Sequence, residues 1–259
     1  MASLVNSWFA FVKPNLAADI RLFCFPYAGG SAMTYRTWSD LLPKNIEVYP
    51  VELPGRGSRM REQPYTNMTP LVHDLGVALK PYLDKPYAFW GHSMGALIGF
   101  ELARLFRRWQ LPGPMQLFAS GHTAPQVKSS HQPIYNLPER EFLVELRQLE
   151  GTPEAVLNNQ ELMQLLIPML RADFEVNETY RYDPEPPLAC PITVYGGAND
   201  RDVNREALEA WREQTSADFA LHIFAGGHFF LQSAQSQVLQ TLTYDLQKLV
   251  ATILKVKSK

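Results

Sequence analysis

The stretch Tyr87-Ala88-Phe89-Trp90-Gly91-His92-Ser93-Met94-Gly95-Ala96-Leu97 decides how this chain is organised. It begins as a short apolar strand and passes through Gly-x-Ser-x-Gly into a segment whose apolar residues recur at helical spacing as far as Trp109. A strand that turns sharply into a helix through this pattern lifts a serine hydroxyl above the edge of a sheet. The stretch therefore predicts Ser93 as a nucleophile; the alternative is a chance serine in a helix-start turn.

Strand-like and helix-like segments alternate on both sides of this turn. Besides the strand that leads to Ser93, strands are expected at 20–25, 46–51, 115–119, 192–195 and 219–224. Helices are expected at 32–42, 70–83, 94–109 and 205–213, and a strongly periodic helix follows the last strand. This alternation predicts an α/β fold with a mostly parallel central sheet and helices on both faces.

The region between Gly121 and Pro191 breaks the alternation. It contains no convincing strand, only helical patterns at 139–149, 155–157 and 161–182, separated by prolines. Such an insertion is expected to form a lid over the strand ends and to close a substrate site; the alternative is an extra helical layer with no functional role. We therefore expect a single domain, residues 1–259, with a helical lid at residues 122–188.

The composition of the 259 residues excludes several classes of protein. With 46% apolar residues the chain can bury a substantial core, and its net charge of −2, without a long run of one sign, points away from nucleic acid and anionic membranes. No stretch approaches the roughly 18 apolar residues of a membrane span. Cys24 and Cys190 lie in or beside strand-like segments, which favours free thiols, and no metal-ligand spacing exists. We expect a soluble, cytoplasmic monomer without a metal.

A serine nucleophile needs a base, usually a histidine, whose pKa lies near the working pH. The chain has six histidines: His73, His92, His122, His131, His222 and His228. On this architecture the chain order is serine, acid, histidine, which leaves His222 and His228. His222 lies inside a strand-like run, whereas His228 follows Gly226-Gly227 in the loop at the strand's end, where catalytic groups gather. His228 is therefore the predicted base, and His92 is expected to pack or to hydrogen-bond locally.

The acid that orients the imidazole is expected in the equivalent loop after the strand at 192–195. Asp200 and Asp202 both lie in this loop. Asp200 is closer to the strand end, in the turn made by Gly196-Gly197. Asp202 lies beside the start of the next helix, where capping is the plain alternative role. Asp200 is therefore the preferred acid.

An acyl-transfer site also needs N–H donors for the oxyanion of its tetrahedral intermediate. One donor is expected from the backbone of Met94, the residue after the nucleophile. The second is expected from the loop Pro26-Tyr27-Ala28-Gly29-Gly30, whose glycines allow the backbone to approach a substrate closely. Ala28 is the predicted donor, with its neighbour Tyr27 as the alternative; an ordinary glycine turn would be the structural explanation.

Several ordered motifs together resemble those of the type II thioesterases, which are stand-alone α/β-hydrolases that accompany nonribosomal peptide and polyketide synthetases. These motifs are Phe25-Pro26-Tyr27-Ala28-Gly29-Gly30, Leu53-Pro54-Gly55-Arg56-Gly57, Gly91-His92-Ser93-Met94-Gly95, Gly196-Gly197 to Asp200, and Gly226-Gly227-His228-Phe229-Phe230-Leu231. The resemblance covers about residues 22–231 and implies the α/β-hydrolase fold, with a mobile lid over 125–187. Ser93, Asp200 and His228 match the family's catalytic positions.

The same resemblance implies hydrolysis of acyl thioesters held on the phosphopantetheine arm of an acyl or peptidyl carrier domain. This reaction would restore stalled carriers, and it needs no cofactor of the enzyme's own. A second possible resemblance is to thioesterases that release medium-chain fatty acids. The remaining alternatives are a carboxylesterase or lipase, an acyl transferase, and an inactive hydrolase-fold binding subunit, although all three catalytic positions hold competent residues.

Two clusters of arginines are candidates for attracting an acidic carrier domain. They are Arg56, Arg59 and Arg61 after the second strand, and Arg104, Arg107 and Arg108 on the helix after Ser93. The alternative is that these side chains are solvated or paired locally, and Arg56 in its glycine-flanked turn is a candidate for a structural role.

Overall fold

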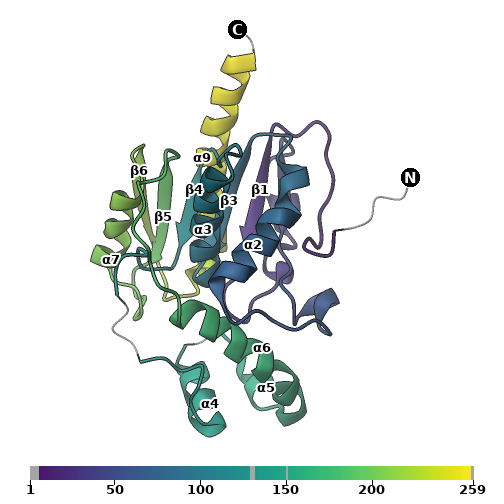
Figure 1. Ribbon diagram of the computed structural model, residues 1–259, viewed down its shortest axis with the longest axis vertical. Coiled ribbons are helices and arrows are strands. Elements are labelled where there is room, and N and C mark those ends of the chain that lie inside the picture. The colour runs from purple at the N-terminus through teal and green to yellow at the C-terminus, as the bar shows by residue number, and fades with distance from the viewer. Residues whose placement is uncertain (1–5, 129–131, 150, 258–259) are drawn as a thin grey trace.

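A computed structural model describes residues 6–128, 132–149 and 151–257 of the protein. Its centre is a six-stranded sheet in the order β2-β1-β3-β4-β5-β6, in which every neighbouring pair is parallel (Figure 1). The strands are β1 (Ile20–Phe25), β2 (Ile46–Pro50), β3 (Tyr87–His92), β4 (Leu117–Ser120), β5 (Ile192–Gly197) and β6 (Phe219–Phe224). Each expected strand is present close to its predicted bounds, which confirms the α/β fold and its parallel sheet.

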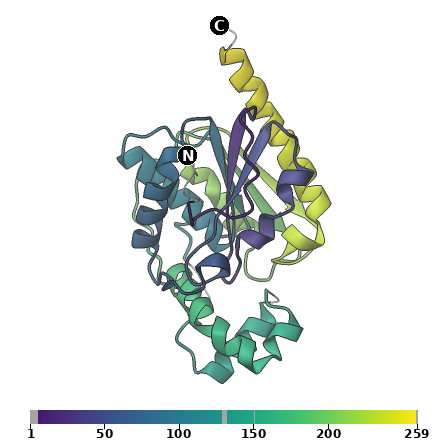
Figure 2. The same ribbon diagram turned by 90° about the vertical axis from the view of Figure 1, so that its right-hand side faces the viewer.

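Helices cover both faces of the sheet, as Figure 2 shows from the side. They are α1 (Trp38–Leu41), α2 (Met68–Leu79), α3 (Met94–Arg108), α4 (Glu139–Gln148), α5 (Glu154–Leu157), α6 (Gln160–Glu178), α7 (Arg205–Glu209), α8 (Phe230–Ser233) and α9 (Gln235–Lys257). α2 and α3 pack on one face, and α9 packs on the other together with α1.

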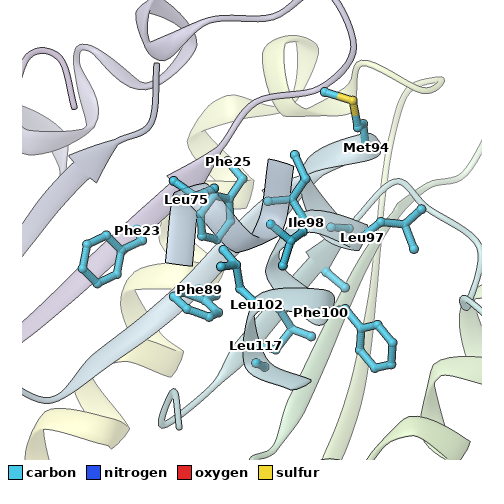
Figure 3. Close-up of a cluster of buried hydrophobic side chains, with 14 of the residues drawn as sticks. Phe23, Phe25, Leu75, Phe89, Met94, Leu97, Ile98, Phe100, Leu102 and Leu117 are labelled. Atoms are coloured by element: carbon cyan, nitrogen blue, oxygen red, sulfur yellow. The ribbon is translucent and has the colours of Figure 1, made fainter. Parts of the chain in front are cut away.

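Alternating residues of the strands supply the two apolar cores, because successive side chains of a strand point to opposite faces. Phe23 and Phe25 of β1 lie in the core under α2 and α3, whereas Leu22 and Cys24 lie in the core under α9. Figure 3 shows the first of these cores, with labelled side chains from β1, β3, α2 and α3: Phe23, Phe25, Phe89, Leu75 and Ile98. The sheet is therefore buried on both faces, which holds the strand ends in place for the site.

Four of the predicted helices differ from the structure. Those expected at 70–83 and 205–213 end as α-helices at Leu79 and Glu209 and continue as 3-10 turns, and the other two are changed by contacts with distant residues. The helix expected at 32–42 is a 3-10 turn at Ala32–Tyr35 followed by the short α1. The hydroxyl of Tyr35 donates to the carbonyl oxygen of Phe25 at 2.8 Å, which ties the first turn to the end of β1. The helix expected at 161–182 ends at Glu178, beyond which the hydroxyl of Tyr180 donates to Glu101 on α3 at 2.7 Å. In both cases a tertiary contact overrides the local helical pattern.

The helices α4, α5 and α6 lie together at one end of the sheet, between β4 and β5 in the chain (Figure 1). They share an apolar cluster of their own, made by Phe142, Leu146, Leu157, Met163, Ile167, Met169 and Leu170. The described part of 122–188 thus has the helical content that the sequence predicts. We call α4, α5 and α6 the lid helices.

In the part of the chain that the structure describes, no helix combines the length and the apolarity needed to cross a bilayer. Cys24 and Cys190 are both free thiols, the first buried and the second partly so. Burial raises the pKa of the Cys190 thiol to about 11, which keeps it protonated at neutral pH.

Candidate active site

Ser93 lies in the tight turn between the end of β3 and the start of α3, and its backbone adopts φ 53° and ψ −122°. Few residues other than glycine adopt a positive φ, and such strain clusters at functional sites. The two flanking glycines have no room for a side chain. A Cβ on Gly91 would lie 2.0 Å from the carbonyl oxygen of Gly95, and a Cβ on Gly95 would lie 2.2 Å from that of Phe25. The turn therefore needs glycine at both positions, as the motif predicts.

His228 and Asp200 meet at the carboxyl end of the sheet. The Nδ1 atom of His228 lies 2.8 Å from Oδ2 of Asp200, whose side chain is only 1% exposed. The other oxygen, Oδ1, accepts hydrogen bonds from the backbone N–H groups of Asp202 and Val203 at 2.9 and 3.2 Å. The carboxylate is thus held in a fixed orientation toward the imidazole. A hydrogen bond at Nδ1 leaves Nε2 of His228 as the nitrogen available to a nucleophile.

Asp202, the alternative acid, belongs to the same cluster. Asp200, Asp202 and His228 each offer one ligand atom, and these atoms lie within 4.8 Å of one another. This spacing alone would suit a metal ion. The hydrogen bond between Asp200 and His228 engages two of the three groups with each other.

Ser93 and His228 both line a small cavity beneath the lid helices. Its volume is about 50 Å³, and its wall consists of Tyr27, Ala28, Ser93, Leu146, Leu149, Gly151, Thr152, Leu170, Phe174, His228 and Phe229. Among the described residues, no group forms a hydrogen bond with the Ser93 hydroxyl, so Ser93 and His228 share a cavity without being bonded to each other. Catalytic hydrogen bonds are often long in ligand-free enzymes and tighten when substrate binds. Leu146, Leu149, Gly151, Thr152, Leu170 and Phe174 of this wall lie in the lid helices or between them.

Two backbone N–H groups beside Ser93 have no hydrogen-bond acceptor within the described ranges: those of Ala28 and Met94. One neighbour of each is occupied: Ser93 N–H donates to the carbonyl oxygen of Ser120 at 2.7 Å, and Gly29 N–H donates to Asp173 at 2.7 Å. Tyr27 N–H also lacks an acceptor in this part of the structure, so both predicted alternatives in the loop remain open.

The remaining described histidines have other surroundings. His92 is fully buried, its Nδ1 lies 2.9 Å from the Ser120 hydroxyl, and burial holds its pKa well below the usual range, so it is neutral. This confirms local bonding for His92. His222 faces Asp245 of α9 at 3.7 Å, and His73 pairs with its neighbour on α2. His122 contacts Asn177 of α6 at 3.2 Å. His131 lies outside the described residues.

Most members of the two arginine clusters form ion pairs with carboxylates of this chain, which is the alternative to a docking surface. Arg56 and Arg59 are buried and pair with Asp173 and Glu62. In the second cluster Arg104 is buried against Glu101, and Arg107 and Arg108 both pair with Glu185. Glu62 and Glu101 lie three residues from their arginines, whereas Asp173 and Glu185 lie far away in the sequence. This is the local pairing that stood as the alternative.

Asp173 is the site residue that the sequence analysis missed. It lies on α6, is 3% exposed and contacts the backbone of the loop that carries Ala28. A signal was present in the sequence: Asp173 falls among the buried positions Met169, Leu170, Ala172 and Val176 of α6, where a charged residue needs a partner. The identity of that partner is not visible in the helix pattern.

Comparison with known proteins agrees with the fold. The thioesterase domain family matches residues 20–246. The chain is 45% identical to the gramicidin S biosynthesis protein GrsT of Aneurinibacillus migulanus, over 96% of this chain and 97% of the relative. Among solved structures, it is 35% identical to the type II thioesterase BorB from the borrelidin biosynthetic cluster, with a TM-score of 0.84 over 92% of this chain and 97% of the other.

A further relative carries a different name. The chain is 46% identical to the linear gramicidin dehydrogenase LgrE of Brevibacillus parabrevis, over 93% of each protein. A dehydrogenase would be expected to have Gly-x-Gly-x-x-Gly after a strand, and this sequence has no such motif. The family model matches most of the chain, and a relative of nearly the same length is 45% identical. The chain therefore belongs to the thioesterase family and is a hydrolase of thioesters.

Proposed function

We propose that this protein is an editing type II thioesterase, which hydrolyses acyl groups from the phosphopantetheine arms of carrier domains in a nonribosomal peptide or polyketide synthetase. One observation carries the proposal. Ser93 in its strained turn shares a cavity with the His228–Asp200 pair, in a chain that aligns end to end with a biosynthetic thioesterase of this kind.

In the proposed reaction, the Ser93 hydroxyl attacks the thioester carbonyl while Nε2 of His228 takes its proton. Asp200 holds Nδ1–H and stabilises the imidazolium. The N–H groups of Met94 and Ala28 stabilise the oxyanion, the C–S bond breaks, and the pantetheine sulfur leaves with a proton from His228. His228 then deprotonates a water molecule, which attacks the acyl-enzyme. The carboxylic acid leaves and Ser93 regains its proton.

The size of the cavity bears on how the substrate enters. The cavity that Ser93 and His228 line has a volume of about 50 Å³. Binding sites for small molecules usually measure about 300–1,000 Å³. We infer that the lid helices α4 and α5 move away from the cavity to admit the acyl group and the pantetheine arm, and that the described state is the closed one. The acyl chain preferred by the site depends on the open state.

The proposed partner is an acyl or peptidyl carrier domain, and the protein is proposed to act as a cytoplasmic monomer without a cofactor or metal of its own. The two free thiols support a reducing compartment. Ion pairs neutralise most of the clustered arginines, so recognition is proposed to rest on the acylated arm as much as on the carrier's charge.

The test is hydrolysis of acyl groups from acylated carrier proteins, compared with simple esters and with medium-chain acyl thioesters. We expect carrier-bound short acyl groups to give the highest kcat/KM. Ser93→Ala should abolish both turnover and labelling by a fluorophosphonate probe, while Ser236→Ala, at an exposed serine on α9, should change neither. Preference for medium-chain substrates would favour a fatty-acyl thioesterase, preference for free esters a carboxylesterase, and an unlabelled wild type an inactive binding subunit.

A further inference from the structure

The carboxylate of Asp173 reaches out of the lid into the loop beside Ser93. Its Oδ2 atom accepts the N–H of Gly29 at 2.7 Å and a guanidinium N–H of Arg56 at 2.7 Å. Its Oδ1 atom accepts a second guanidinium N–H of Arg56 at 2.6 Å. Asp173 therefore links a lid helix to the backbone that holds Ala28 and, at the same time, to a buried arginine.

Arg56 binds both Asp173 and the loop that carries Ala28. This side chain is 3% exposed and comes from the loop after β2, 117 residues before Asp173 in the chain. Besides its two bonds to Asp173, it donates to the carbonyl oxygen of Gly30 at 2.8 Å. The N–H of Gly29 and the C=O of Gly30 are thus both held, one by each member of the ion pair.

Close packing at Gly29 further restricts the conformation of this loop. Gly29 adopts a φ of +79°, and a Cβ at this position would lie 2.6 Å from Cδ2 of Leu170. Leu170 precedes Asp173 by about one helical turn, so both residues lie on the same face of α6. That face rests directly on the loop that continues from β1.

We propose that Asp173 is a positioning residue, which orients the peptide groups around Ala28 so that this residue's N–H points at the oxyanion. The inference rests on the proposed function. It has a consequence for the lid: α6 must stay on the loop during the reaction, because its departure would leave Gly29 N–H unpaired and a buried guanidinium without a counter-charge. The part of the lid that opens is then α4, which carries Leu146 of the cavity wall, together with α5.

The test compares Asp173→Asn with a matched control. Glu101→Gln neutralises another buried carboxylate, on α3, that accepts from Arg104 at 2.5 Å and does not touch the loop. Loss of one oxyanion donor costs about 100- to 1,000-fold in kcat, so partial misplacement should cost about 10- to 100-fold. We expect Asp173→Asn to lower kcat by this amount with KM within about threefold of the wild type. Glu101→Gln should leave kcat within about twofold, even where both variants lose similar thermal stability.

A double variant separates positioning from stability. Arg56→Met with Asp173→Leu replaces the buried ion pair by apolar side chains, which often restores stability. It still leaves Gly29 N–H without an acceptor, so kcat should stay low in a well-folded protein. Recovery of kcat together with stability, or a kcat of Asp173→Asn within twofold of the wild type, would overturn the inference. If the wild type fails to hydrolyse acyl-carriers, the proposed function fails; the inference is then decided by the same variants with a simple ester, whose oxyanion uses the same donors.

Discussion

Replacing Gly95 by alanine tests the close packing behind the turn at Ser93. The new Cβ would lie 2.2 Å from the carbonyl oxygen of Phe25 and 2.9 Å from that of Pro26. Both are backbone atoms, so no rotamer change can relieve the contact. The closer one falls 0.8 Å short of the 3.0 Å limit that Cβ atoms respect. The start of α3 and the end of β1 must therefore separate by about that much.

The displacement should appear mainly in catalysis. β1 is held on both sides by β2 and β3, so the segment free to move is the loop that carries Ala28. A misplacement of about 1 Å in an active site can cost about 100-fold, and we expect kcat/KM to fall by this order. For stability, alanine gains about 1 kcal/mol over glycine in a helix, whereas overpacking costs about 1–3 kcal/mol. The net loss is then up to about 2 kcal/mol.

The assay is kcat/KM on an acyl-pantetheine thioester together with thermal unfolding. Gly113→Ala is the matched control, because a Cβ there meets no atom within 4 Å. It should leave activity unchanged and shift stability by no more than about 0.5 kcal/mol. A Gly95→Ala variant with kcat/KM within threefold of the wild type would refute the reasoning, since the clash would then have been relieved without moving the loop that carries Ala28.

Asp200→Asn should lower kcat by about 10,000-fold, because a neutral amide can hold the wrong imidazole tautomer and cannot stabilise the imidazolium. Single-turnover acylation rates test this prediction, and a loss of less than tenfold would contradict it. His92 is neutral when buried but takes up a proton in the unfolded chain below about pH 6.5, so the free energy of unfolding should fall with decreasing pH, by up to about 1.4 kcal/mol per unit. Urea unfolding at pH 7.5 and 5.5 should show a smaller fall for His92→Gln, and equal falls would argue against the assignment. Phe142→Ala leaves a cavity in the apolar cluster of the lid helices. Amide hydrogen exchange should become faster in α4, α5 and α6 and stay unchanged in the sheet. Uniform acceleration would show that the lid helices do not unfold separately from the sheet.

The order of strands and helices could be read from the sequence because it rests on local patterns. Apolar alternation and helical spacing are properties of neighbouring residues, and they located all six strands. The motif around Ser93 and the loops after β5 and β6 likewise named Asp200 and His228, which the structure brings within 2.8 Å of each other. The ends of helices were less predictable, since Tyr35 and Tyr180 are held by partners elsewhere in the chain.

By itself, then, the sequence determined the layered sheet, the turn at Ser93 and the candidate residues around it. Only the tertiary structure decided which charges are paired and how closed the cavity is. From the sequence, Arg56 is a candidate both for docking and for a structural role in its glycine-flanked turn, and its partner Asp173 lies 117 residues away on a lid helix. Periodicity tells which face of a helix is buried, but what that face meets depends on the packing of distant segments. The contact between α6 and the loop that carries Ala28 depends on such packing, so the sequence alone does not predict it.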